Sequence, residues 1–196
     1  MNSLIGAPTQ EVIRRVVVRN ALIQKIHFKV VARSKWYERE REIGDTSLRR
    51  DEVLAGRITE LIASMEKDSV LTILSPVTVM NGERAHIPML DFKIPLQEEN
   101  SRLLITSLEE GVADGKMPEG VLLETERSYH YYGYTLLTDD KWRRFMAESL
   151  VYTPAGAHLV DCRWVGWRLL YGAAALRLNE KNPGLGVPRV LCEISK

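Results

Sequence analysis

Three short stretches place polar side chains at or beside the ends of apolar segments, an arrangement that suits ligand binding or catalysis. Asp91 ends the apolar stretch 86–91, Ser128 and His130 stand two residues apart in a tyrosine-rich stretch, and Asp161 ends the stretch 158–161. A buried carboxylate costs free energy unless it pairs with a cation or with hydrogen-bond donors. The two aspartates are therefore candidates for binding a cation, although Asp91 could equally cap its strand or pair near Lys93.

Ser128 and His130 are predicted to share one face of a strand, because side chains two apart on a strand point the same way. A hydroxyl and an imidazole can both donate hydrogen bonds to phosphate oxygens. A serine–histidine nucleophilic pair is the rival interpretation, and the absence of a Gly-x-Ser-x-Gly turn argues against it. The neighbouring tyrosines could stack on bases or simply belong to the core; they are Tyr129, Tyr131, Tyr132 and Tyr134.

Asp161 is followed by a predicted helix and by arginines that could bind a triphosphate. Two strand-end aspartates brought together would hold a divalent cation, and nearby guanidinium groups would neutralise phosphate charge. The alternative for this segment is structural, because Trp164, Trp167 and Leu170 have the spacing of a core-facing helix.

The order of these motifs resembles that of the archaeo-eukaryotic primase superfamily, in particular its small prokaryotic primase-like and primase-polymerase proteins. The resemblance rests on an acidic strand motif, then Ser-x-His, then a hydrophobic-Asp motif trailed by arginines. The matching stretches are Pro88 to Phe92, Arg127 to Gly133, and Asp161 to Trp164 continuing to Leu178. The match covers roughly residues 88–188, and the N-terminal 1–87 are far less diagnostic.

This resemblance implies a role for each matched residue. Asp91 and Asp161 would be catalytic metal ligands for Mg or Mn, and the remaining matched side chains would contact the nucleotide. Those expected nucleotide-binding residues are Ser128, His130 and Arg177, with Arg163 and Arg168 as weaker candidates. The resemblance further implies an RRM-like sheet carrying the site, and synthesis of DNA or RNA from NTPs or dNTPs on a nucleic-acid template.

One position departs from the superfamily pattern. The first motif usually has two acids separated by one residue, and here Lys93 stands at the second of these positions. Its ammonium group would share a face with Asp91, where it could replace one metal, contact phosphate or abolish catalysis. Glu124 and Glu126 are the acids that could substitute for the missing carboxylate.

Two functions therefore remain open at the level of sequence. The first is a metal-dependent nucleotidyltransferase of primase or primase-polymerase type, an enzyme of DNA replication. The second is a catalytically degenerate primase-like module that binds nucleotide or single-stranded nucleic acid, in a mobile-element or prokaryotic defence system. A complete priming machine would need a helicase or other partner proteins, because no zinc module or helicase segment is recognisable.

Composition bounds the remaining choices. The 196 residues, 45% hydrophobic and 27% charged, are typical of one globular domain, here an α+β unit spanning 1–196. No apolar run suits a membrane helix and no signal peptide is evident, which predicts a cytoplasmic protein with no membrane partner. Cys162 and Cys192 are too few for a disulfide framework.

Charge is distributed unevenly along the chain. Residues 11–50 carry eleven Lys or Arg against five acids, whereas residues 83–126 carry four against ten. A phosphate-binding surface beside a metal-attracting segment would produce this pattern, and so would two ordinary solvated faces.

Hydrophobic periodicity predicts alternating helices and strands. Helices are expected from Thr9 and over 51–67, 101–110, 141–150 and 164–175, and strands over 25–32, 70–74, 77–80, 85–92, 121–126, 129–137, 159–161 and 190–194. The Asn81-Gly82 pair predicts a hairpin. Residues 33–50 are expected to form a loop or hairpin tip, and 176–179 a turn.

Overall fold

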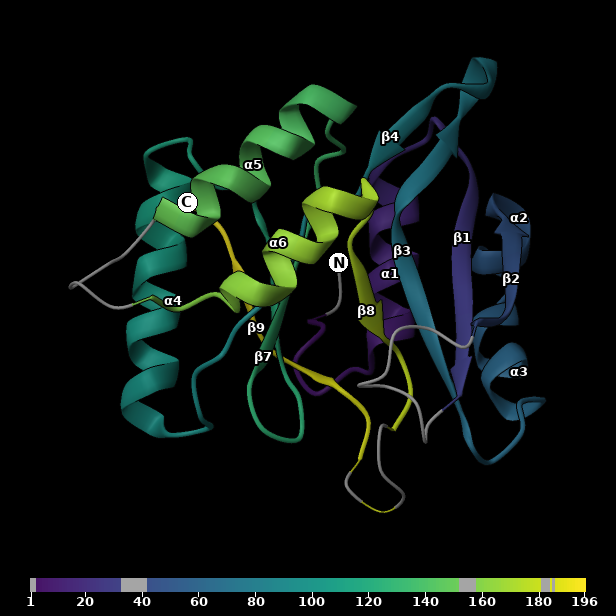
Figure 1. Ribbon diagram of the computed structural model, residues 1–196, viewed down its shortest axis with the longest axis horizontal. Coiled ribbons are helices and arrows are strands. Elements are labelled where there is room, and N and C mark those ends of the chain that lie inside the picture. The colour runs from purple at the N-terminus through teal and green to yellow at the C-terminus, as the bar shows by residue number, and fades with distance from the viewer. Residues whose placement is uncertain (1–2, 33–41, 152–157, 181–183, 185) are drawn as a thin grey trace.

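The computed structural model describes residues 3–32, 42–151, 158–180, 184 and 186–196. These residues fold into two antiparallel sheets flanked by helices, which confirms the expected α+β class (Figure 1). None of the helices in this described part has the length and apolarity that a membrane crossing needs.

The first sheet is built around the long strand β3. Its order is β2 (Glu42–Arg49), β1 (Ile23–Ala32), β3 (Ser69–Val79) and β4 (Arg84–His86), and β8 (Ala175–Arg177) also pairs with β3. The predicted hairpin between β3 and β4 is confirmed: Asn81 and Gly82 both have φ of 78°, as a turn with two left-handed central residues requires.

The second sheet carries two of the three sequence motifs. Its order is β5 (Met89–Asp91), β7 (Tyr129–Gly133), β6 (Gly120–Glu124) and β9 (Arg189–Ile194). The final strand, expected over 190–194, is confirmed and lies at the edge of the sheet.

The chain crosses from the first sheet to the second at Ile87-Pro88, so the prediction of one strand over 85–92 is wrong. The amide of Ile87 donates to the carbonyl of Ser75 at 2.8 Å, which belongs to the first sheet. Pro88 has no amide hydrogen, and its carbonyl accepts from Gly133 of the second sheet at 2.9 Å. One continuous apolar run therefore serves two sheets.

Helices cover both sheets. They are α1 (Thr9–Arg19), α2 (Arg50–Leu54), α3 (Arg57–Ala63), α4 (Glu98–Ala113), α5 (Asp139–Val151) and α6 (Cys162–Tyr171). Figure 1 shows α4 beside the second sheet, α2 and α3 at the far edge of the first, and α6 crossing in front of both.

Three further elements differ from the sequence-based expectations. Residues 42–49 of the expected loop form strand β2, an edge strand whose polar sequence lacks the apolar alternation of a half-buried strand. The helix expected over 51–67 is broken by Gly56, which has φ of 88°. The segment expected to turn after Leu176 instead forms β8, because it pairs with β3.

The aromatic residues divide between core and surface. Tyr129, Tyr131 and Tyr132 are fully buried, which confirms their core interpretation. Trp167 is 37% and Leu170 is 77% exposed, so their prediction as core residues is wrong. A helical period shows which residues share a face but not whether another element covers that face.

Candidate functional site

Asp91 and His130 meet on neighbouring strands of the second sheet. They are direct partners in the β5–β7 register, and the His130 Nε2 atom lies 3.8 Å from Asp91 Oδ1. The histidine side chain is 7% exposed and the carboxylate 27%. The pair therefore combines a buried imidazole with a carboxylate that solvent can reach.

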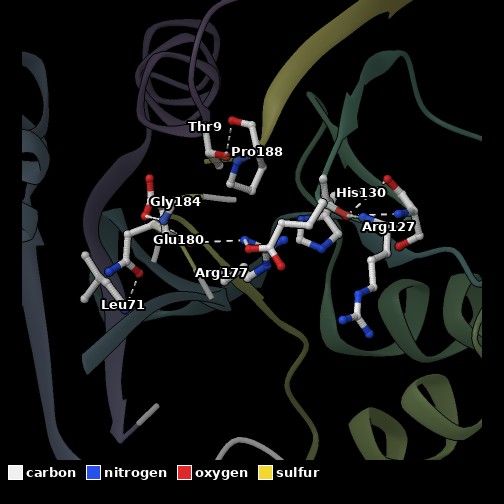
Figure 2. Close-up of polar contacts among 12 residues, drawn as sticks. Thr9, Leu71, Arg127, His130, Arg177, Glu180, Gly184 and Pro188 are labelled. Atoms are coloured by element: carbon white, nitrogen blue, oxygen red, sulfur yellow. Dashed lines mark hydrogen bonds and ion pairs between the residues drawn. The ribbon is translucent and has the colours of Figure 1, made fainter. Parts of the chain in front are cut away.

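Arg177 reaches this pair from the other sheet. It ends β8 opposite Thr72 of β3, and Figure 2 shows it extending toward His130. Its Nη1 atom lies 3.3 Å from Glu126 Oε1, and the two side chains are only 7% and 4% exposed. A buried ion pair thus joins β8 to the turn between β6 and β7.

Burial and the arginine charge determine the protonation of His130. Desolvation, followed by the positive charge of Arg177, lowers the pKa of His130 to about 3. Burial also lowers the pKa of Arg177, whereas the carboxylates of Glu126 and Asp91 raise it. At neutral pH the cluster therefore contains a neutral imidazole, a guanidinium cation and two nearby carboxylates.

Tyr132 contributes a hydroxyl to the same cluster. It stands two residues after His130 on β7, so both side chains share a face. Burial raises the pKa of Tyr132, the charge of Arg177 lowers it, and the charge of Asp91 raises it. Among the described residues, neither the Tyr132 hydroxyl nor His130 Nδ1 has a hydrogen-bond partner. Buried polar atoms of this kind call for a polar ligand or water.

Asp161 lies beside Asp91 through the backbone. Its amide donates to the Asp91 carbonyl at 2.9 Å, and the preceding Val160 bridges to Phe92. Its Oδ1 atom accepts from the amides of Arg163 and Trp164, both at 3.0 Å. The carboxylate therefore caps the N-terminus of α6, which leaves Oδ2 for a further ligand.

The other predicted site residues lie around this cluster. Ser128 precedes β7, and its amide donates to Thr125 Oγ1 at 3.2 Å; the prediction that it shares a strand with His130 is wrong because the turn extends to residue 128. Lys93 and Arg163 are exposed, and in the described part of the chain neither makes a hydrogen bond or ion pair with the cluster through its side chain. Arg168 lies with its guanidinium carbon 5.8 Å from the ring centre of Trp164.

The donor set fits a divalent cation only in part. Within the described ranges, no group of three or more His, Cys, Asp or Glu side chains is arranged to hold a metal ion. Mg²⁺ is commonly bound by one or two carboxylates together with substrate phosphates and water. Asp91 and Oδ2 of Asp161 are the atoms that would serve, with a triphosphate completing the coordination.

Sequence reasoning recognised Asp91, His130 and Arg177, which the structure brings together. It named Glu126 only as a possible replacement acid and did not assign Tyr132 to the site. The spacing of Tyr132 from His130 was the available signal, since residues two apart on a strand share a face. No sequence pattern indicates the ion pair between Glu126 and Arg177, because it depends on how the two sheets pack together.

A second polar cluster has the composition of a catalytic triad. His86 Nδ1 lies 3.0 Å from Ser75 Oγ, and His86 Nε2 lies 2.5 Å from Asp139 Oδ1. Ser75 is fully buried and accepts a hydrogen bond from the amide of Ala174 at 2.9 Å. A buried hydroxyl that already serves the backbone is not a nucleophile for an external substrate, so this cluster is structural.

The fold and site define an α+β domain with a polar, partly buried cluster at the junction of two antiparallel sheets. A family model described as archaeo-eukaryotic primase 1D-like matches residues 52–186. The chain belongs to this family. No curated protein and no solved structure matches.

Proposed function

We propose that this primase-like domain binds the triphosphate of an NTP or dNTP, together with Mg²⁺ or Mn²⁺, at the junction of the two sheets. One observation carries the proposal: Asp91, His130 and Arg177 come from three different strands of two sheets and form one cluster. The guanidinium of Arg177, the imidazole of His130 and the nearby hydroxyl of Tyr132 suit phosphate oxygens. The carboxylate of Asp91 suits the accompanying cation.

Nucleotidyl transfer is the second candidate. The backbone hydrogen bond between Asp91 and Asp161 favours it. Because this bond places the two residues side by side, their carboxylates extend from neighbouring backbone positions. A divalent cation held there would polarise the transferred phosphoryl group and neutralise its developing charge. Binding without turnover is favoured by the capping role of Asp161 and by Lys93 at the position of the second acid.

Nucleic acid is the proposed second ligand. Trp167 and Tyr171 of α6 are both partly exposed, with ring centres 5.9 Å apart. Exposed aromatic rings near basic side chains are suited to stacking on bases of a single strand. The same helix begins at Asp161, so a strand bound there would lie next to the proposed nucleotide site.

The binding proposal is tested by titrating dATP into the purified protein with Mn²⁺ by isothermal calorimetry. We expect Asp91→Asn to weaken metal-dependent binding by at least about tenfold. Asp140→Asn on α5, whose side chain is 96% exposed, removes the same charge elsewhere and should leave binding unchanged. Equal binding by both variants would show that Asp91 does not hold the cation.

Lys93→Asp separates binding from turnover. The change restores two carboxylates on one strand face, so we expect tighter Mn²⁺ binding and a gain of nucleotide incorporation on a primed template. Lys141→Asp, at an exposed position of α5, is the control with the same charge change. If the native protein already incorporates nucleotides and Lys93→Asp abolishes this activity, the lysine belongs to the mechanism and a binding-only function is excluded.

A further inference from the structure

Glu126 occupies the side of Arg177 that a phosphate group would use. Its carboxylate lies 3.3 Å from Nη1 of the arginine, and the same nitrogen donates to the carbonyl of Asn179 at 3.2 Å. Both charged side chains are more than nine-tenths buried. A carboxylate and a phosphate oxygen make the same kind of charge-assisted bond to a guanidinium, so they compete for it.

Arg177 needs an anion whether or not a ligand is bound. Removing one partner of a buried ion pair is strongly destabilising, because the remaining charge is left in a poorly solvated position. In the protein alone this anion is Glu126, and a bound triphosphate would supply another. Exchange of one anion for the other therefore keeps the arginine neutralised throughout.

The turn that carries Glu126 is held by bonds that do not involve its side chain. The amide of Thr125 donates to the carbonyl of Ser128 at 2.9 Å, and the amide of Ser128 donates to Thr125 Oγ1 at 3.2 Å. The flanking Glu124 and Arg127 are exposed. Movement of the Glu126 side chain away from Arg177 would therefore leave these bonds of the β6–β7 hairpin intact.

Two further atoms of the cluster are buried without a partner in the described part of the chain. They are His130 Nδ1 and the hydroxyl of Tyr132, on side chains that are 5% and 0% exposed. Both residues interact electrostatically with Arg177. The cluster thus offers additional hydrogen-bonding capacity beside the arginine that the Glu126 carboxylate does not use.

We propose that Glu126 is an internal competitor that closes the site, so that a nucleoside triphosphate binds only by displacing its carboxylate from Arg177. The proposal rests on the proposed function, because it assigns the triphosphate to the same arginine. It makes the turn between β6 and β7 a gate whose closed state includes the Glu126–Arg177 ion pair. The affinity for triphosphate is then lower than it would be if Glu126 did not occupy Arg177.

The test compares Glu126→Gln with the native protein by calorimetric titration of Mn²⁺-dATP and of inorganic triphosphate. Because a neutral amide competes with phosphate far less well than a carboxylate, we expect the affinity for both probes to rise by about tenfold or more. Glu124→Gln removes the same charge from an exposed position two residues away, and it should change affinity little.

A second variant guards against a folding defect. Glu126→Asp keeps the negative charge but shortens the side chain by one methylene, so it weakens the ion pair and should raise affinity by a smaller factor. If the native protein binds the probes and neither variant binds more tightly than Glu124→Gln, the gate is disproved and the binding site stands. If neither the native protein nor either folded variant binds a probe, both the gate and the proposed nucleotide site are overturned.

Discussion

His130 is the residue whose chemistry depends most on its surroundings. An exposed imidazole is partly protonated near neutral pH, whereas burial and Arg177 keep this one neutral. A neutral imidazole can accept a proton or donate a hydrogen bond, so it can adapt to either a phosphate or a carboxylate neighbour. Its role in the cluster is therefore that of an adjustable hydrogen-bonding group and not that of a fixed cation.

The lowered pKa of His130 predicts acid sensitivity of the metal-free fold. The unfolded chain takes up a proton near pH 6.5, but folded His130 does so only near pH 3. Its contribution to stability is thus complete above pH 6.5 and decreases as pH falls toward 3, with a slope of up to about 1.4 kcal/mol per pH unit. Urea unfolding from pH 7 to 4.5 should show this slope in the native protein, and it should be shallower in His130→Asn.

His27 and His86 also have lowered pKa values, caused first by burial, so they keep part of the slope in His130→Asn. Hydrogen bonding to His86 lowers the pKa of Asp139 as well, but this carboxyl affects stability mainly below the pH range of the experiment. An identical slope in native protein and variant would contradict the assignment of a neutral, buried His130.

Two glycines allow strands β6 and β7 to approach closely. Gly120 and Gly133 face each other in the register. A Cβ at Gly120 would lie 2.8 Å from the ring of Tyr131, and one at Gly133 would lie 2.7 Å from Pro118. These contacts are too short for any other residue, so the hairpin that carries His130 depends on both glycines.

Gly120→Ala is therefore expected to destabilise the protein by about 1–3 kcal/mol, because the new methyl group must displace backbone and a buried ring. Gly166→Ala in α6 is the control, since a Cβ there meets nothing within 4 Å; it should stabilise by about 0.5–1 kcal/mol through helix propensity. Chemical denaturation of both variants measures the difference. Equal effects would contradict the close approach of the strands.

Local sequence signals predicted elements well where one signal dominates. The period of α1, the Asn81-Gly82 turn and the edge strand β9 each follow from residues within the element itself. The predictions failed where pairing decides the structure. Strand β2 is polar but pairs with β1, and β8 is too short to stand out from the turn that follows α6.

A buried polar network holds the last strand of the first sheet against β3 and connects it to helix α5. Ser75 of β3 exchanges hydrogen bonds with Ala174, the residue just before β8, at 2.8 and 2.9 Å. Its hydroxyl also bonds to His86, which contacts Asp139 of α5 and stacks on Trp142 with ring centres 4.4 Å apart. This network holds β8 in place and therefore positions Arg177.

Ser75→Ala should cost about 1–3 kcal/mol, because it leaves the buried amide of Ala174 and a buried imidazole nitrogen without this partner. Ser149→Ala is a matched control: Ser149 is also buried, but among the described residues its hydroxyl donates to the carbonyl of Met146 in its own helix and does not link separate elements. That variant should lose no more than about 1 kcal/mol. Thermal unfolding followed by circular dichroism distinguishes the two.

The candidate site was predictable in its parts but not in its assembly. The motifs identified Asp91, His130, Asp161 and Arg177 from their order in the chain. Their mutual positions depend on the crossing at Pro88 and on β8 pairing with β3, which no local pattern encodes. The pairing of Glu126 with Arg177 arises only when both sheets are in place.

The capping role of Asp161 has a consequence for tracing how such proteins diverge. An aspartate that caps a helix stabilises the fold by about 0.5–2 kcal/mol whether or not it also holds a metal. Selection for stable folding alone would therefore preserve this aspartate in related proteins that have lost catalytic activity. The exposed side chain of Lys93, two positions after Asp91, caps no helix. This position is therefore the one at which relatives with and without catalytic activity should differ.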